Sequence, residues 1–170
     1  MIAAPGRIYG PRATGPFAGT LRRYARGQLP LLAGPEAAYG WAHVADVAAG
    51  LALLLERGAP GQTYTLAGEA ATLRDFFVAC AQAGGPPPPR WLPGAPAAWA
   101  GRWLRIIDRV FPKKLRGLHE RISALAPRVQ VADSAGARVL GWTPRSLAAG
   151  LPETLDWFRA GKDDLPTILS

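Results

Sequence analysis

A strand–helix–strand pattern lies in residues 39–66, which read YGWAHVADVAAGLALLLERGAPGQTYTL. The segment from Tyr39 to Val44 is expected to be extended, and Thr63 to Leu66 is a second run of residues that favour strands. Between them apolar residues recur at helical spacing until Gly58, which is expected to close the helix. Short strands that alternate with amphipathic helices are typical of an α/β fold.

The flanking sequence continues this alternation. Ile2 to Ala4 reads as the end of a strand that enters a loop at Pro5-Gly6, and Phe17 to Arg26 reads as a helix. A strand this short at the start suggests a sheet whose earlier strands are not in the chain. Thr72 is a good N-cap, with Asp75 three residues later, for a helix that ends before the prolines at 86–89.

The sequence changes character after the proline-rich linker 86–89. We expect one domain over 1–170, with a helical insertion at about 90–126 and a short strand at Val129–Val131. A helix capped by Asp133 is then expected to end at Gly141. The last helix contains Pro152, so it begins either near Ser146 with a kink or at Pro152 itself.

Composition excludes several classes of protein. The 170 residues are 49% hydrophobic and 19% charged, which is a globular composition and not a disordered one. The single cysteine, Cys80, excludes an intrachain disulfide framework, is expected to be a buried structural thiol, and fits a reducing compartment. No secretory leader or membrane-spanning run is evident, so a cytoplasmic location is expected. The net charge of +8 favours anionic partners without choosing among them.

Five blocks of sequence, in a fixed order, resemble one enzyme family. The blocks are Pro5-Gly6-Arg7-Ile8-Tyr9-Gly10-Pro11-Arg12, His43-Val44-Ala45-Asp46-Val47-Ala48, Thr63 to Leu66 with Gly68-Glu69 and Thr72-Leu73, Asp133-Ser134 through Leu140-Gly141-Trp142-Thr143-Pro144, and Gly150-Leu151 with Thr154, Trp157 and Phe158. Together they resemble the C-terminal half of the extended short-chain dehydrogenase/reductases. This group includes NAD(P)-dependent epimerases and dehydratases, dihydroflavonol-4-reductase-like enzymes and 3-beta-hydroxysteroid dehydrogenase-like enzymes.

The resemblance implies a fold and a set of partners. The implied fold is the C-terminal part of a Rossmann-type sheet plus a mainly helical substrate-binding lobe. The implied cofactor is NAD or NADP, and the implied substrate is a small molecule. Pro5, Gly6 and Ile8 match the loop that faces the nicotinamide in the family. Tyr39 and Trp41 would flank the substrate cleft, and Arg12 would face an acidic substrate.

Each of these residues also has a structural interpretation. Pro5, Gly6 and Ile8 can form an ordinary loop at the end of a strand. Tyr39 and Trp41 can pack in the core, and Arg12 can be solvated. His43 and Asp46 lack the third ligand that a metal site needs, so we expect no metal site. Asp46 in the first turn of a helix instead suits the helix dipole, and His43 would orient the preceding loop.

The family's chemical groups are missing from the sequence. No glycine-rich dinucleotide motif follows a strand, and none of the four tyrosines is followed by lysine four residues later. We therefore predict no catalytic residue in this chain and no activity without a complementary Rossmann half or another copy.

A non-catalytic interaction module is the alternative function. Residues 90–121 carry eight Lys or Arg against Asp108 and Glu120, with tryptophans interleaved. Such a segment resembles an interfacial amphipathic helix that binds a membrane surface. A stacking surface for nucleic acid is disfavoured, and packing of the tryptophans on the substrate lobe is the simpler interpretation.

Overall fold

The α/β class is confirmed by a computed structural model, which describes residues 1–91, 137–138 and 140–161. The strands are β1 (Ile2–Pro5), β2 (Arg7–Tyr9), β3 (Leu31–Leu32), β4 (Ala38–His43), β5 (Thr63–Leu66), β6 (Glu69–Thr72) and β7 (Arg90–Trp91). The helices are α1 (Pro16–Ala25), α2 (Val44–Arg57), α3 (Leu73–Gln82) and α7 (Leu147–Arg159).

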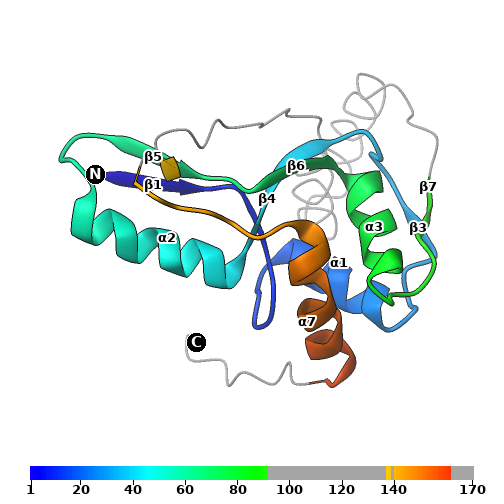
Figure 1. Cartoon of the computed structure of the whole chain (residues 1–170). Helices are drawn as coiled ribbons and strands as arrows, with labels where there is room; N and C mark the ends of the chain where they lie inside the picture. Colours follow the sequence, from blue (N-terminus) through cyan, green and yellow to red (C-terminus); the bar gives the residue numbers. More distant parts are fainter. Residues whose placement is uncertain (92–136, 139, 162–170) are drawn as a thin grey trace, which may run out of the picture.

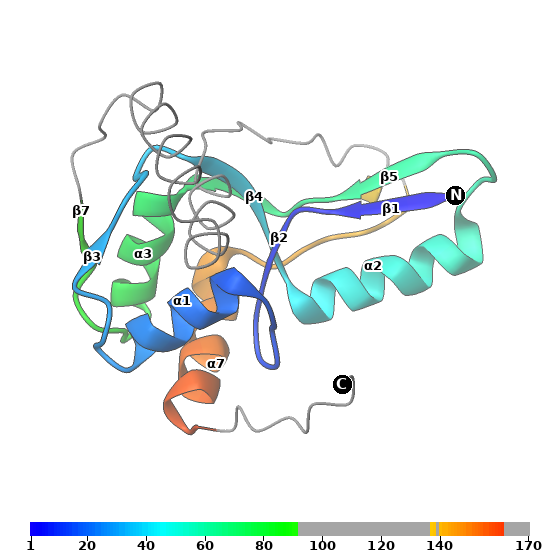
Figure 2. The same ribbon diagram turned by 180° about the vertical axis from the view of Figure 1, so that it is seen from behind.

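The strands form three small sheets. β1 pairs with β5, β2 and β6 lie on either side of β4, and β3 pairs with β7. All pairings are parallel except that of β4 with β6. In Figure 1 the β1–β5 pair extends to one side of the molecule, with α2 along it, while α1, α3 and α7 gather at the other side. The reverse view in Figure 2 shows the same separation.

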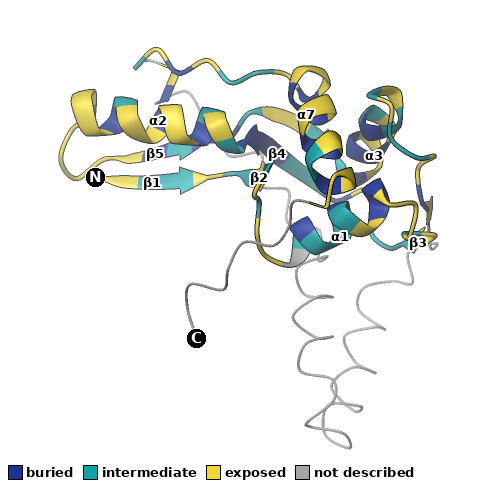
Figure 3. Ribbon diagram, turned by 90° about the horizontal axis from the view of Figure 1, so that it is seen from below, coloured by how far each residue is buried: buried dark blue, intermediate teal, exposed yellow. Residues whose placement is uncertain are grey.

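Strand β4 separates two hydrophobic clusters. Successive side chains of a strand point to opposite faces, so Trp41 and Ala42 enter different cores. Trp41 packs with residues of α1, α3 and α7, including Leu21, Phe76 and Leu151. Ala42 packs with α2 and β5 in a cluster that includes Trp142. The buried faces of α2 and α7 are dark in Figure 3, and the outer face of α2 is exposed.

The predicted helix ends are confirmed where the structure describes them. Thr72 and Asp75 form a reciprocal capping box at the start of α3, and Gly58 follows the end of α2. Ser146 caps α7 by accepting a hydrogen bond from the Ala149 backbone N–H, so Pro152 lies inside the helix. This outcome selects the earlier of the two predicted starts.

The predicted loop at Pro5-Gly6 is wrong in one respect. The chain does not leave the sheet after Pro5: it changes partner at Gly6, from β5 to β4. A Cβ on Gly6 would lie 2.2 Å from the Gly40 carbonyl oxygen, so this close approach of two backbones requires glycine. Parallel pairing of β2 with β4 holds Ile8 in a strand, which local sequence does not indicate.

The structure also adds strands that the sequence did not indicate. β6 joins β4, and the first two residues of the predicted helical insertion form β7 beside β3. The rest of that insertion, the strand at Val129–Val131 and the Asp133 cap lie outside the described residues. Within the described part, no helix is long and apolar enough to cross a membrane.

Candidate functional site

The three residues predicted to face the cofactor lie where β1 gives way to β2. Pro5 pairs with Leu66, and Ile8 pairs with Ala42. The Pro5 and Ile8 side chains are exposed, with Ile8 at 36%. Their backbone path is set by the close contact of Gly6 with Gly40. This edge is therefore accessible, and its contact with a nicotinamide ring stays a prediction.

Arg7 lies among aromatic rings on the other face of β2. Its guanidinium carbon lies 3.9 Å from the ring centroid of Tyr39, 5.0 Å from that of Phe17 and 5.8 Å from that of Trp41. Partial burial lowers the pKa of Arg7, and Tyr39 opposes that shift. The sequence contains Arg7 within the first family-like block, but no local pattern indicates this aromatic setting.

Trp41 and Tyr39, the predicted substrate residues, differ in exposure. Trp41 is 1% exposed, stacks on Phe76 at 4.0 Å between centroids, and donates a hydrogen bond from Nε1 to the Ala71 carbonyl. Trp41 therefore occupies the core position that the structural interpretation of the sequence allowed. Tyr39 is partly buried and contacts Arg7, so of the two only Tyr39 combines surface exposure with a polar group. A substrate contact by either residue stays a prediction.

Arg12 lies away from this group, in the turn that follows β2. It is the only described residue other than glycine with positive φ, at 59°. Arg12 is exposed. Its guanidinium carbon lies 5.6 Å from the centroid of the Trp157 ring, so Arg12 borders α7. Arg12 and Arg7 contact different aromatic rings, and the substrate role of Arg12 stays a prediction.

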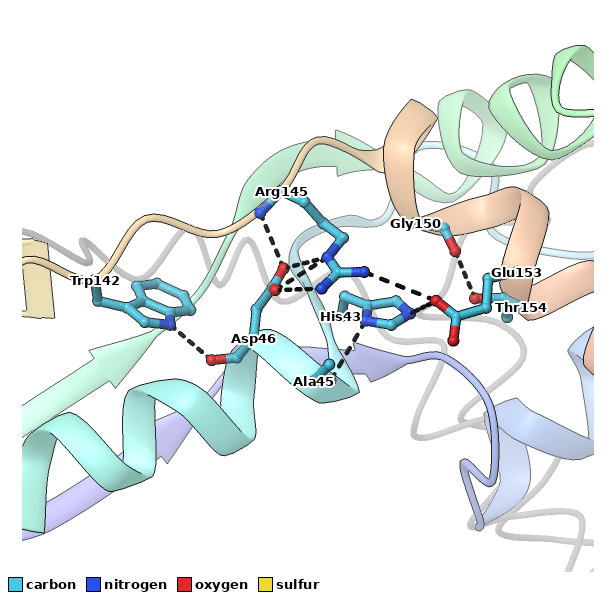
Figure 4. Close-up of polar contacts among 8 residues, drawn as sticks. All are labelled: His43, Ala45, Asp46, Trp142, Arg145, Gly150, Glu153 and Thr154. Atoms are coloured by element: carbon cyan, nitrogen blue, oxygen red, sulfur yellow. Dashed lines mark hydrogen bonds and ion pairs between the residues drawn. The ribbon is translucent and has the colours of Figure 1, made fainter.

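A second polar cluster joins α2 to α7 (Figure 4). The Arg145 side chain binds the Asp46 carboxylate and reaches Glu153 at 3.8 Å. Trp142 donates from Nε1 to the Asp46 carbonyl at 2.7 Å. Asp46, predicted to interact with the helix dipole, therefore also anchors the segment that leads into α7. Neither Arg145 nor Glu153 was singled out from the sequence, because nothing local marks them as partners.

His43 caps α2 from a buried position. Its Nδ1 accepts a hydrogen bond from the Ala45 N–H at 3.3 Å, so the proton of the neutral ring is on Nε2. Nε2 is buried without a hydrogen-bond partner, and the nearest acidic group, Glu153, is 3.9 Å away. Burial and then the positive charge of Arg145 lower the pKa of His43, while Glu153 and Asp46 oppose the shift. His43 is thus a neutral capping residue in a packed site.

Two ionisable groups of the described residues, Tyr9 and Cys80, are buried in the core. Burial raises the pKa of both Tyr9 and Cys80, so each stays protonated near neutral pH. Tyr9 is enclosed by His43 and Phe76. No group of three metal-ligating side chains occurs among the described residues.

Solved structures share this architecture. No known family model and no curated protein matches the sequence. The structure of gox2253 matches with a TM-score of 0.69 and 29% identity, over 95% of this chain and 49% of that chain. A nucleoside-diphosphate-sugar epimerase from Pseudomonas aeruginosa, PA4631, matches with a TM-score of 0.67 and 23% identity, over 94% of this chain and 48% of that chain. The chain has the epimerase/dehydratase fold.

The UDP-glucuronic acid 4-epimerase from Bacillus cereus gives the same result. It matches with a TM-score of 0.65 and 18% identity, over 94% of this chain and 45% of that chain, and its structure holds NAD and a UDP-sugar. The resemblance predicted from the five sequence blocks is thereby confirmed. The chain spans about half the length of the solved structures that it matches.

Proposed function

We propose that this chain is the substrate-binding half of an NAD(P)-dependent epimerase, dehydratase or reductase. A separate α/β unit would supply the glycine-rich dinucleotide site and the Tyr-x-x-x-Lys pair. NAD(P) bound there would carry the hydride. In this chain, Pro5, Gly6 and Ile8 would border the nicotinamide, and Tyr39, Trp41 and Arg12 would belong to the substrate side.

The incomplete parallel sheet is the observation that carries this proposal. Among the described residues β1 pairs only with β5, and parallel sheets of two strands are not expected to be stable alone. β5 is protected, because Tyr64 and Leu66 are buried, but none of the four residues of β1 is buried. Ile2 is 62% exposed. The edge of β1 is therefore the natural place for a further strand.

The outer face of α2 supports the same conclusion. Leu51 is 43% exposed and Leu55 is 79% exposed, one turn apart on the helix. Ala48 and Ala52 beside them are exposed as well. An apolar stripe on a helix next to an open sheet edge is expected to pack against a partner. We also keep a cytoplasmic location in the proposal, because the single thiol of Cys80 is buried and needs no oxidising compartment.

The test supplies the missing unit. The part of gox2253 that this chain does not cover would be produced separately and mixed with this chain, and NAD(H) and NADP(H) binding would be titrated. We expect no tight binding by this chain alone and restored binding by the mixture. Intact gox2253 is the positive control. Sub-micromolar cofactor binding by the isolated chain, or no complex with the added half, would contradict the proposal.

A pair of edge variants tests the mode of docking. Ile2→Asp adds a charge to the open edge of β1, whereas Leu31→Asp adds the same charge to β3, where Leu31 is 46% exposed. We expect Ile2→Asp alone to prevent association with the added half. Equal association of the two variants would show that β1 is not the docking edge.

The alternative of a membrane-surface module depends on residues 92–121, which lie outside the described residues. Only Arg90 and Trp91 of the basic segment are described, and Trp91 packs against the core cluster with Phe77. This alternative stays a prediction. Liposome co-sedimentation of the chain and of a variant with Arg105, Arg109, Lys113 and Lys114 reversed in charge would test it.

A further inference from the structure

Arg7 is a cation that, within the described part of the chain, is surrounded by aromatic rings and is not paired with a carboxylate. Its guanidinium lies 3.9 Å from Tyr39 and 5.0 Å from Phe17, measured to the ring centroids. The side chain is partly buried, so water shields its charge less than at an exposed site. Rings of this kind stabilise a cation but leave its net charge uncompensated.

Three other described arginines have a carboxylate partner, whereas Arg12, over the Trp157 ring but exposed, has none among the described residues. Arg74 also lies over an aromatic ring, 5.6 Å from the centroid of Trp91, but Glu36 binds it at 3.1 Å. Arg145 is bound by Asp46, and Arg159 by Asp156. No described carboxylate forms an ion pair with Arg7.

The guanidinium of Arg7 has no carboxylate partner among the described residues, and this indicates that a ligand supplies the anion. Arginine is the side chain that best recognises planar oxyanions, because its guanidinium presents several N–H donors in one plane. Arg7 follows Gly6 and precedes Ile8, the two residues proposed to border the cofactor, and it contacts Tyr39 from the proposed substrate side. An anion bound to Arg7 would therefore lie at the meeting point of those two groups.

We propose that Arg7, with Tyr39 and Phe17, binds a carboxylate group of the substrate. The charge balance favours this class of anion. One guanidinium neutralises one carboxylate, whereas a phosphate with two charges would keep an unpaired charge beside three aromatic rings. The rings also suit a substrate whose carboxylate is attached to an apolar or planar body. This inference rests on the proposed function, since it names the substrate class for the same lobe.

The experiment uses the full chain and two probes of opposite kind. Benzoate offers one carboxylate on a planar apolar body, and inorganic pyrophosphate offers a compact, highly charged anion. Binding of each would be measured by calorimetry to wild type, Arg7→Gln and Arg74→Gln. Arg74→Gln is the matched control, because Arg74 has the same kind of aromatic neighbour but a carboxylate partner.

We expect wild type and Arg74→Gln to bind benzoate more tightly than pyrophosphate. Arg7→Gln is expected to weaken benzoate binding about tenfold or more, as loss of a charged hydrogen-bond partner does. Equal benzoate affinity in all three proteins, no benzoate binding by wild type, or tighter Arg7-dependent binding of pyrophosphate would overturn the carboxylate assignment.

A second measurement tests the proposal on wild type itself, in case Arg7→Gln does not fold. The Arg7 side-chain Nε–Hε signal of ¹⁵N-labelled wild type can be assigned from its absence in Arg7→Lys, which keeps the charge. Benzoate is expected to shift that signal and leave the Arg74 signal in place; equal or absent shifts would overturn the inference. The benzoate measurements do not depend on the cofactor-binding test with the gox2253 unit. Failure of the carboxylate site can therefore be distinguished from failure of the proposed function.

Discussion

Arg145 binds both oxygens of the Asp46 carboxylate, although the two residues are 99 positions apart in the chain. Its Nε donates to Oδ1 at 3.0 Å and to Oδ2 at 3.1 Å, and its backbone N–H donates to Oδ2 at 2.9 Å. The Asp46 side chain is only 13% exposed. The contact fixes the segment before α7 against the first turn of α2, and so determines how the two helical parts of the fold are joined.

Neutralising this carboxylate is expected to destabilise the fold. Asp46→Asn keeps the shape of the side chain but removes the charge that Arg145 binds, so we expect a loss of about 1–2 kcal/mol in the free energy of unfolding. Urea titration followed by circular dichroism measures it. The matched control is Glu36→Gln, which breaks the exposed pair with Arg74 and is expected to change stability by less than about 0.5 kcal/mol. Equal losses in the two variants would contradict a special role for Asp46.

Stability is expected to fall in mild acid because of His43. Its pKa in the folded chain is below the ordinary value of 6.5, so on acidification the unfolded chain takes up a proton first. This contribution is fully present above pH 6.5 and is lost as the pH falls below it, with a limiting slope of about 1.4 kcal/mol per pH unit for one proton. His43→Asn, which retains an N-cap acceptor, is expected to flatten the curve between pH 7 and 5. An unchanged slope in that variant would show that other groups cause the loss.

Two glycine substitutions are expected to have opposite effects. A Cβ at Gly150 would lie 2.5 Å from the Tyr9 hydroxyl and 3.0 Å from the His43 ring, so Gly150→Ala is expected to cost about 1–3 kcal/mol. Gly19 is in α1 and has nothing within 4 Å of such a Cβ. Gly19→Ala is therefore expected to stabilise the chain by about 0.5–1 kcal/mol through helix propensity. Thermal unfolding of both variants tests the packing of α7 on β2 and β4. A Gly150→Ala variant that unfolds at the same temperature as wild type would contradict this packing.

Local sequence predicted those parts of the fold that depend on neighbouring residues. The apolar period of α2, the Thr72 capping box and the strand at Thr63–Leu66 each depend on contacts within a few residues, and the sequence predicts all three. The family-like blocks predicted the epimerase/dehydratase fold for the same reason, because each block is a short local pattern.

Only the tertiary structure decided which distant residues meet. Local sequence does not show that β1 and β2 join different sheets, because that depends on β4 and β5 arriving beside them. Tyr39 and Trp41 lie on the same face of β4, but packing with α1, α3 and α7 buries Trp41, whereas Tyr39, nearer the start of the strand, stays partly exposed next to Arg7. The pairing of Asp46 with Arg145 likewise required α7 to pack near α2. Strand pairing, burial and ion pairing link residues far apart in sequence. The sequence alone therefore determined the four described helices, the strands β1, β4 and β5 and the fold, while long-range packing determined the other strands and the candidate site.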